Sequence, residues 1–230
     1  MDIIQKSATA IRQADALLIG ASNGLSIAEG YHIFANNQMF QRLFGDFQQR
    51  YGIRNVLEGC FFNYPDLHDR HTFLQRLVHH WVDEYQPTEV MKDLLEIVNG
   101  KDYFILTSNA DTHLELSGFS PEKVFEVEGT FQDMLMQRPP TDKNRQLKSF
   151  LDRYHNMRLV ILELGIGSQN RLIKLPLMQL AAYEPQATYI TLNLEHELYI
   201  PTTIAGKSIG IAGDIAATLH QLKKELACMQ

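Results

Sequence analysis

Cysteine is scarce in this sequence, and the placement of the two that occur excludes a common kind of metal site. Cys60 and Cys228 are far apart, and no Cys-x-x-Cys pair is present. A zinc ribbon held by four thiolates is therefore impossible. Several of the nine histidines fall within the stretch 68–80, but no carboxylate or cysteine pattern completes a ligand set around them. We predict no metal site.

Long apolar runs and an excess of positive charge are also missing. No run of about 18 apolar residues occurs, which argues against a membrane-spanning helix. The formal net charge of −6 gives no electrostatic reason to expect nucleic acid or an anionic membrane as a partner. The N-terminal segment has Ile4, Ala8 and Ile11 on one helical face and lacks the apolar core of a secretory signal. We expect a cytoplasmic protein.

Short apolar runs recur along the chain and alternate with segments of helical periodicity. About six of these runs have the length and composition of buried strands. They lie at 14–19, 103–106, 124–127, 159–164, 188–193 and 208–211. Strands that alternate with helices pair in parallel, so the sequence predicts an α/β protein with a Rossmann-like, doubly wound parallel sheet.

The gap between the first and second predicted strands contains no strand pattern. Glycines and prolines divide it into helical pieces, which indicates a small helical module inserted after the first strand. We predict a discontinuous Rossmann-like domain at 1–30 and 87–230, and a helical insertion at 31–86. Phe34 or Phe40 could cover a ligand, but phenylalanines at this density favour the core of the module.

Polar and glycine residues follow several of the predicted strands. Gly20 to Gly30 (GASNGLSIAEG) follows the first strand, and Thr107 to Asp111 (TSNAD) follows the second. In a parallel sheet these strand ends border the crevice where ligands bind, and a glycine-rich turn before a helix suits an anion such as phosphate. The alternative is that both segments are ordinary turns without a ligand. The glycine spacing is not that of a Rossmann dehydrogenase.

The segment TSNAD, followed by Gly118 and by Glu128-Gly129, resembles the sirtuin core pattern TQN(I/V)D…G…HG. The glycine-rich stretch 20–30 and the segment 193–195 (NLE) fall in sirtuin order, so the resemblance covers most of the chain. Further details are similar to the macrodomain-linked class M sirtuins. They are YFILTSNAD at 103–111, Gly118-Phe119, ELGIG at 163–167 and IKLP at 173–176.

The resemblance implies NAD as the cofactor and a set of residues that bind it. Sirtuins bind the pyrophosphate at the first glycine-rich loop, the nicotinamide ribose at the TSNAD segment, and adenosine at the later strand exits. The corresponding positions are Gly20, Ala21, Ser22, Gly24, Leu25, Ser26, Ser108, Asn109, Asp111, Gly165, Gly167, Ser168, Asn193, Leu194, Glu195, Asp214 and Ile215. Arg171 and Lys174 either contact phosphate or lie on a solvated helix face.

The chain departs from the sirtuin pattern at three places. Glu128 replaces the histidine that, in sirtuins, takes a proton from a ribose hydroxyl. The segment 31–34 (YHIF) replaces the PDFR-type segment, and the cysteines of the zinc ribbon are absent. A carboxylate can accept a hydrogen bond from ribose and stabilise positive charge at the anomeric carbon, which suits ADP-ribosyl transfer or NAD hydrolysis better than deacylation.

Three functional interpretations remain open. In the first, the chain is an NAD-dependent protein ADP-ribosyltransferase in which Asn109, Asp111 and Glu128 are catalytic. In the second it is an NAD-dependent protein deacylase, and in the third a non-catalytic protein that binds NAD or ADP-ribose. The class M resemblance further implies a lipoyl carrier-like acceptor protein and a macrodomain hydrolase as partners.

Overall fold

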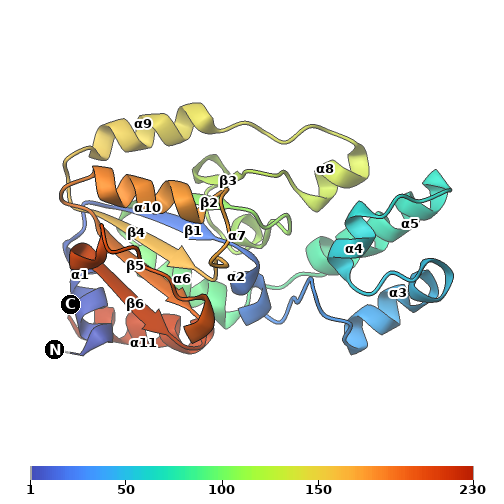
Figure 1. Cartoon of the computed structure of the whole chain (residues 1–230), viewed down its shortest axis with the longest axis horizontal. Helices are drawn as coiled ribbons and strands as arrows, with labels where there is room; N and C mark the ends of the chain where they lie inside the picture. Colours follow the sequence, from blue (N-terminus) through green and yellow to red (C-terminus); the bar gives the residue numbers. More distant parts are fainter. Residues whose placement is uncertain (1, 230) are drawn as a thin grey trace.

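The computed structural model describes residues 2–229, so Met1 and Gln230, which the predicted domain ranges include, lie outside it. Its centre is a six-stranded, all-parallel sheet with the strand order β3-β2-β1-β4-β5-β6 (Figure 1). The strands are β1 (Ala16–Ala21), β2 (Asp102–Thr107), β3 (Val124–Glu126), β4 (Leu159–Leu164), β5 (Thr188–Asn193) and β6 (Ser208–Ala212). The predicted Rossmann-like parallel sheet is confirmed. The chain order reverses between β1 and β4, which places a topological switch point at the centre of the sheet.

Helices cover both faces of this sheet. One face packs on α1 (Ile3–Gln13), α6 (Glu89–Val98) and α11 (Ile215–Cys228), and the other on α9 (Asn144–Tyr154) and α10 (Lys174–Tyr183) (Figure 1). The β1 sequence is buried throughout because it lies mid-sheet between these layers.

Polar caps define where the outer helices begin. Asp2 and Gln5 form a reciprocal capping box at the start of α1. The Asp214 carboxylate accepts a hydrogen bond of 2.7 Å from the backbone N of Ala217 and so begins α11. The apolar side chains of Ile215, Leu219 and Leu222 then face the core on the side opposite to the solvated residues.

A helical module extends from one end of the sheet (Figure 1). It contains α3 (Gln38–Tyr51), α4 (Val56–Phe61), α5 (Leu67–Val78) and a π-helical turn, η1 (His79–Asp83). These elements share their own apolar core. The expectation that Phe40 lies in this core is confirmed, whereas Phe34 is 46% exposed and that part of the expectation is wrong.

Short helices link these larger parts. They are α2 (Asn23–Ala28), α7 (His113–Leu116), η2 (Pro121–Lys123), α8 (Phe131–Met136), η3 (Glu195–Glu197) and η4 (Ala205–Lys207). Phe131 of α8 is buried in the core of the helical module, so a segment beyond β3 also holds the module in place. Within residues 2–229, no helix combines the length and the apolar character needed to cross a bilayer.

Candidate functional site

The loops after the three central strands meet at one edge of the sheet. Backbone hydrogen bonds between neighbouring strands continue into these loops. The backbone N of Ser108 donates to Ala21 O at 3.3 Å, and the backbone N of Ser22 donates to Leu164 O at 3.3 Å. This edge carries the carboxyl ends of β1, β2 and β4, next to the switch point. Ligands of open parallel sheets bind in this position.

The first of these loops depends on a contact between two glycines. Gly24 N donates to Gly165 O at 3.1 Å, and a Cβ at Gly24 would lie 2.5 Å from the Cα of Gly165. Gly165 also has a positive φ of 60°, which side chains disfavour. Gly20, by contrast, lies inside β1, where a Cβ would meet the side chain of Leu177. Gly20 thus makes room for α10, and Gly24 and Gly165 bring two loops together.

Asn109 lies at the centre of a buried hydrogen-bond network. Its side-chain nitrogen donates to Ser22 O at 3.1 Å and to Ser26 Oγ at 2.9 Å. Ser26 Oγ in turn donates to Asp111 Oδ2 at 2.5 Å. Because Ser22 O can only accept, the amide nitrogen of Asn109 must face it, and the amide oxygen Oδ1 is left buried without a hydrogen-bond partner. A buried acceptor of this kind favours a ligand that donates a hydrogen bond.

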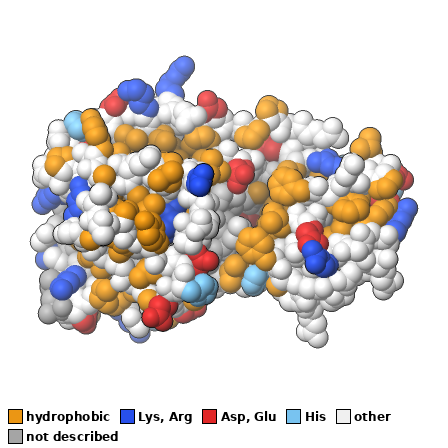
Figure 2. Space-filling view, in the orientation of Figure 1, with side chains coloured by type: hydrophobic (Ala, Val, Ile, Leu, Met, Phe, Trp, Pro, Cys, Tyr) orange, Lys and Arg blue, Asp and Glu red, His pale blue; other side chains and the backbone are white. Residues whose placement is uncertain are grey.

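Ser22, Asn109 and Asp111 line a cleft of about 310 Å³ between the sheet and the helical module. The hollow between the two parts is visible on the molecular surface (Figure 2). Ser22, Ser108, Asn109, Asp111 and Glu128 bring polar groups to it. The module and α8 contribute apolar side chains, namely Ile33, Leu57, Cys60, Phe61, Trp81, Phe131 and Met134. A larger hollow, of about 440 Å³, lies at the opposite edge of the sheet beside Asp102 and Phe150, and it contains none of the predicted site residues.

The structure therefore brings together the three residues predicted to be catalytic. Asn109 and Asp111 are each 5% exposed and held by neighbours, whereas Glu128 is exposed at the edge of the cleft. Ser22 Oγ and Ser108 Oγ lie 2.9 Å apart in the same cleft. Leu25 is fully buried in the core, which leaves only its backbone for a ligand.

The residues predicted to bind adenosine lie along the ends of β4, β5 and β6. Asn193 donates from its side chain to Ile166 O at 2.8 Å, which fixes the loop that contains Gly167 and Ser168. Leu194 and Glu195 are exposed just beyond Asn193. Asp214 caps α11, and the side chain of Ile215 packs in the core.

Glu197 also belongs to this region, although the sequence did not indicate it. Its Oε2 accepts a hydrogen bond of 2.6 Å from the backbone N of Ser168. Hydrogen bonds from Ser168 lower the pKa of the Glu197 carboxyl. An anionic side chain thus lies directly at the loop that follows β4.

Lys174 contradicts both alternatives considered for it. Its side chain is fully buried, and Nζ donates to Glu163 Oε1 at 2.6 Å and to Ile166 O at 3.3 Å. Glu163 also accepts hydrogen bonds from Tyr189 and Thr191. Lys174 therefore neither contacts phosphate nor faces solvent. Its hydrogen bond to Ile166 O holds the loop after β4 from the protein interior.

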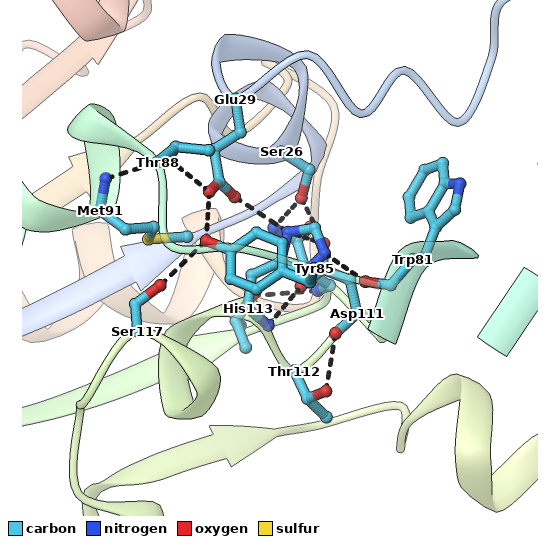
Figure 3. A network of polar contacts seen from close by, with 12 residues as sticks. Ser26, Glu29, Trp81, Tyr85, Thr88, Met91, Asp111, Thr112, His113 and Ser117 are labelled. Carbon is cyan, nitrogen blue, oxygen red and sulfur yellow. Dashed lines mark hydrogen bonds and ion pairs between the residues drawn. The ribbon is translucent and has the colours of Figure 1, made fainter. Parts of the chain in front are cut away.

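His113 joins the cleft to the helical module (Figure 3). Its Nδ1 lies 3.0 Å from Glu29 Oε2, and its Nε2 lies 2.7 Å from the backbone oxygen of Trp81. Asp111 Oδ1 accepts from the backbone N of His113 at 3.2 Å, and Asp111 Oδ2 lies 3.8 Å from Nδ1. Burial lowers the pKa of the His113 imidazole, but the charges of Asp111 and Glu29 outweigh it, and the pKa is raised.

Metal-binding geometry is not found among residues 2–229, where no three His, Cys, Asp or Glu side chains cluster as ligands. Cys60 is buried in the module, and burial raises the pKa of its thiol to about 12. A thiol in that state is a poor nucleophile and a poor ligand at neutral pH.

Comparisons with known proteins find a similar sequence and a similar solved structure that agree with this geometry. A scan against models of protein families finds no match. A Staphylococcus aureus (strain Mu50 / ATCC 700699) protein described as "Protein ADP-ribosyltransferase" is 22% identical, and the match covers 92% of this chain and 84% of that protein. A solved structure described as "Structural Basis for the Mechanism and Regulation of Sir2 Enzymes" superposes with a TM-score of 0.61 at 14% identity, over 100% of this chain and 98% of that one.

The chain has the fold of the Sir2 enzymes, the sirtuins. The resemblance drawn from TSNAD and the glycine-rich loop is confirmed at this level, and the closer likeness to the class M group stays a prediction. On this sirtuin fold the TSNAD loop and Glu128 border one cleft. Glu128 stands where the sirtuin pattern has histidine. Tyr31, the first residue of the segment that replaces the PDFR-type segment, packs edge-on against His113, with ring centroids 4.5 Å apart.

Several residues of this site were not predicted from the sequence. Glu29, Trp81 and His113 form contacts between positions 32 to 84 residues apart, and no local pattern indicates such pairs. Asn23 and Asn170 also line the cleft. One signal was available for His113, because it follows two residues after Asp111 in a segment already assigned to the site.

Proposed function

We propose that this protein is an NAD-dependent ADP-ribosyltransferase of the sirtuin type that modifies a protein acceptor. The observation that carries the proposal is the buried, unpartnered Oδ1 of Asn109, in one cleft with Asp111 and Glu128. An unpaired buried acceptor costs about 1–3 kcal/mol, so the site suits a ligand with a donor at this point. The similar protein from Staphylococcus aureus, described as an ADP-ribosyltransferase, supports the same reaction class.

The residues present fit NAD. Ser22, Gly24 and Ser26 of the first loop would hold the pyrophosphate. Gly24 lies there in close contact with the backbone of Gly165. Asn109 and Asp111 would hold the nicotinamide ribose, and Asn193, Glu195 and the loop at Ser168 the adenosine. When bound, NAD supplies a bond between nicotinamide and the ribose anomeric carbon whose electron pair leaves with nicotinamide.

Glu128 has the position to assist the transfer. Its exposed carboxylate at the edge of the cleft would stabilise positive charge on the ribose and accept the proton that the acceptor nucleophile loses. A carboxylate beside a developing cation acts without any rearrangement of the site. Water in place of the protein acceptor would give NAD hydrolysis by the same residues.

Transfer of label from NAD to protein tests the proposal. The purified chain is incubated with NAD labelled in the adenylate part and with a cell extract that supplies acceptors. Label on protein together with free nicotinamide supports the transferase, whereas free nicotinamide without labelled protein supports hydrolysis. Binding of ADP-ribose without release of nicotinamide would contradict an enzyme and support a protein that only binds the nucleotide.

A further inference from the structure

The hydrogen-bond partners of His113 determine its protonation. Its Nε2 faces the backbone oxygen of Trp81 at 2.7 Å, and a carbonyl oxygen can only accept. Its Nδ1 lies 3.0 Å from a carboxylate oxygen of Glu29, which accepts as well, and 3.8 Å from Asp111 Oδ2, within ion-pair but beyond hydrogen-bond distance. Both ring nitrogens must therefore donate, and a histidine with two donating nitrogens is an imidazolium.

The surroundings keep this cation in place. The side chains of His113 and Glu29 have no exposed area. Tyr85 stacks on the imidazole ring with centroids 3.9 Å apart, and Tyr31 packs against its edge. Burial raises the pKa of both phenols, so they remain neutral and the charges facing His113 are those of Glu29 and Asp111.

The same network spans both connections to the helical module. Glu29 follows α2, where the chain leaves for the module, and Trp81 lies in η1, where the chain returns. The Glu29 Oε1 also accepts from Tyr85 and Thr88, each at 2.7 Å, on the returning segment (Figure 3). The hydrogen bond from His113 goes to the backbone oxygen of Trp81, and the indole ring lies to one side, with its centroid 6.5 Å from that of the imidazole (Figure 3).

We propose that His113 is a positioning residue: as an imidazolium between Glu29 and Asp111, it holds the Asp111 carboxylate in the cleft and ties it to both segments that carry the helical module. This inference rests on the proposed function, in which Asp111 holds the nicotinamide ribose. His113 has no exposed side-chain area and acts through Asp111 rather than on the substrate. Loss of its proton leaves two carboxylates facing a neutral ring, and their repulsion displaces Asp111.

The pH dependence has a definite sign. The folded-state pKa of His113 lies above its usual value of about 6.5, so the stabilisation is fully present below that value and is lost as pH rises through the folded pKa. Turnover of NAD should fall over the same interval, with kcat affected more than KM because binding of the adenosine half does not involve Asp111.

The test combines ring titration by nitrogen NMR with nicotinamide release from NAD as a function of pH. In the free protein, both His113 nitrogens should carry protons at pH 7, and Asp111→Asn should lower the His113 pKa, because it removes a charge that raises it. His113→Gln should reduce kcat about tenfold or more and remove the decline that accompanies deprotonation of His113. Glu29→Gln, which keeps the shape of the network, should shift that decline to lower pH.

His155→Gln is the matched control. His155 also contacts a carboxylate, with Nδ1 2.8 Å from Glu184 Oε1, but it lies next to the amino end of β4, at the opposite edge of the sheet. This variant should keep the wild-type pH profile.

Two results would overturn the inference: a neutral His113 ring at pH 6.5, or a His113→Gln variant with wild-type kcat and pH profile. If wild type releases no nicotinamide, the proposed function fails, and the titration of His113 with its response to Asp111→Asn decides the inference alone. A His113 pKa that Asp111→Asn leaves unchanged would then contradict it.

Discussion

Gly24 and Gly165 lie backbone against backbone: Gly24 N donates to Gly165 O at 3.1 Å, and a Cβ on Gly24 would approach the Cα of Gly165 to 2.5 Å. The two residues come from the loops after β1 and β4, the strands on either side of the switch point. Backbone cannot move aside as a flexible side chain can. The shape of the cleft therefore depends on the absence of a side chain at position 24.

Gly24→Ala should reduce both stability and use of NAD. The new methyl group meets backbone atoms, so we expect a loss of about 1–3 kcal/mol, as for other overpacked sites. Gly45→Ala is the control, because a Cβ there meets only the far end of Gln41 at 3.8 Å inside α3. It should raise stability by about 0.5–1 kcal/mol. Equal thermal midpoints for the two variants would contradict the contact.

Glu128→Gln should separate chemistry from binding. The amide keeps the size of the side chain but has no charge to stabilise the ribose cation and cannot take a proton. We expect nicotinamide release to fall by about 10²–10⁴-fold while the affinity for NAD stays within a few-fold. The measurement pairs steady-state turnover with calorimetric binding. Unchanged turnover would make Glu128 a bystander at the edge of the cleft.

Lys174→Met should destabilise the fold strongly. It leaves the fully buried Glu163 carboxylate without its cation, and such a change costs about 3–5 kcal/mol, or about 6–20 °C in the thermal midpoint for a chain of this size. The double variant Lys174→Met/Glu163→Gln removes both charges and keeps an acceptor for Tyr189. It should recover more than half of the loss. A double variant as unstable as the single one would show that the pairing of charges is not the cause.

Glu115→Gln should stabilise the protein at neutral and alkaline pH. Burial, together with the hydrogen bond to Glu126 and its charge, raises the pKa of the Glu115 carboxyl to about 9. The folded state therefore holds a proton that the unfolded state has released, and wild-type stability declines between about pH 4.5 and pH 9. The advantage of Glu115→Gln in thermal midpoint should grow over this interval. Glu89→Gln, at an exposed pair with Lys92, should show no such growth.

The sheet was predictable from local patterns, because β4 (LVILEL) and β5 (TYITLN) are short, apolar and bounded by polar or glycine residues. The start of α11 likewise follows a local signal, because Asp214 stands directly before an apolar helical face and caps it. Asn109, Asp111 and Glu128 follow β2 and β3, and adjacent parallel strands bring their ends to one edge. These features depend on residues near one another in sequence or on the regular geometry of a sheet.

The buried charges were harder to predict, because their partners come from other elements. Lys174 resembles a solvated lysine at the start of a helix, and only Glu163 within an apolar strand hinted that a buried cation was needed. His113 gives no local sign that Glu29, 84 positions earlier, completes its environment. The exposure of Phe34 likewise depends on how the connection to the module turns.

Nicotinamide release from NAD, measured beside ADP-ribose binding in wild type and Asp111→Asn, tests the proposed NAD cleavage and the role of Asp111 in it. The amide oxygen can still accept the hydrogen bond from Ser26, whereas the charge at position 111 and the acceptor for the backbone N of His113 are lost. We predict measurable release by wild type, a large loss in Asp111→Asn, and ADP-ribose affinity that changes far less. Absence of release by wild type, or equal losses of turnover and ADP-ribose binding in the variant, would contradict the assignment.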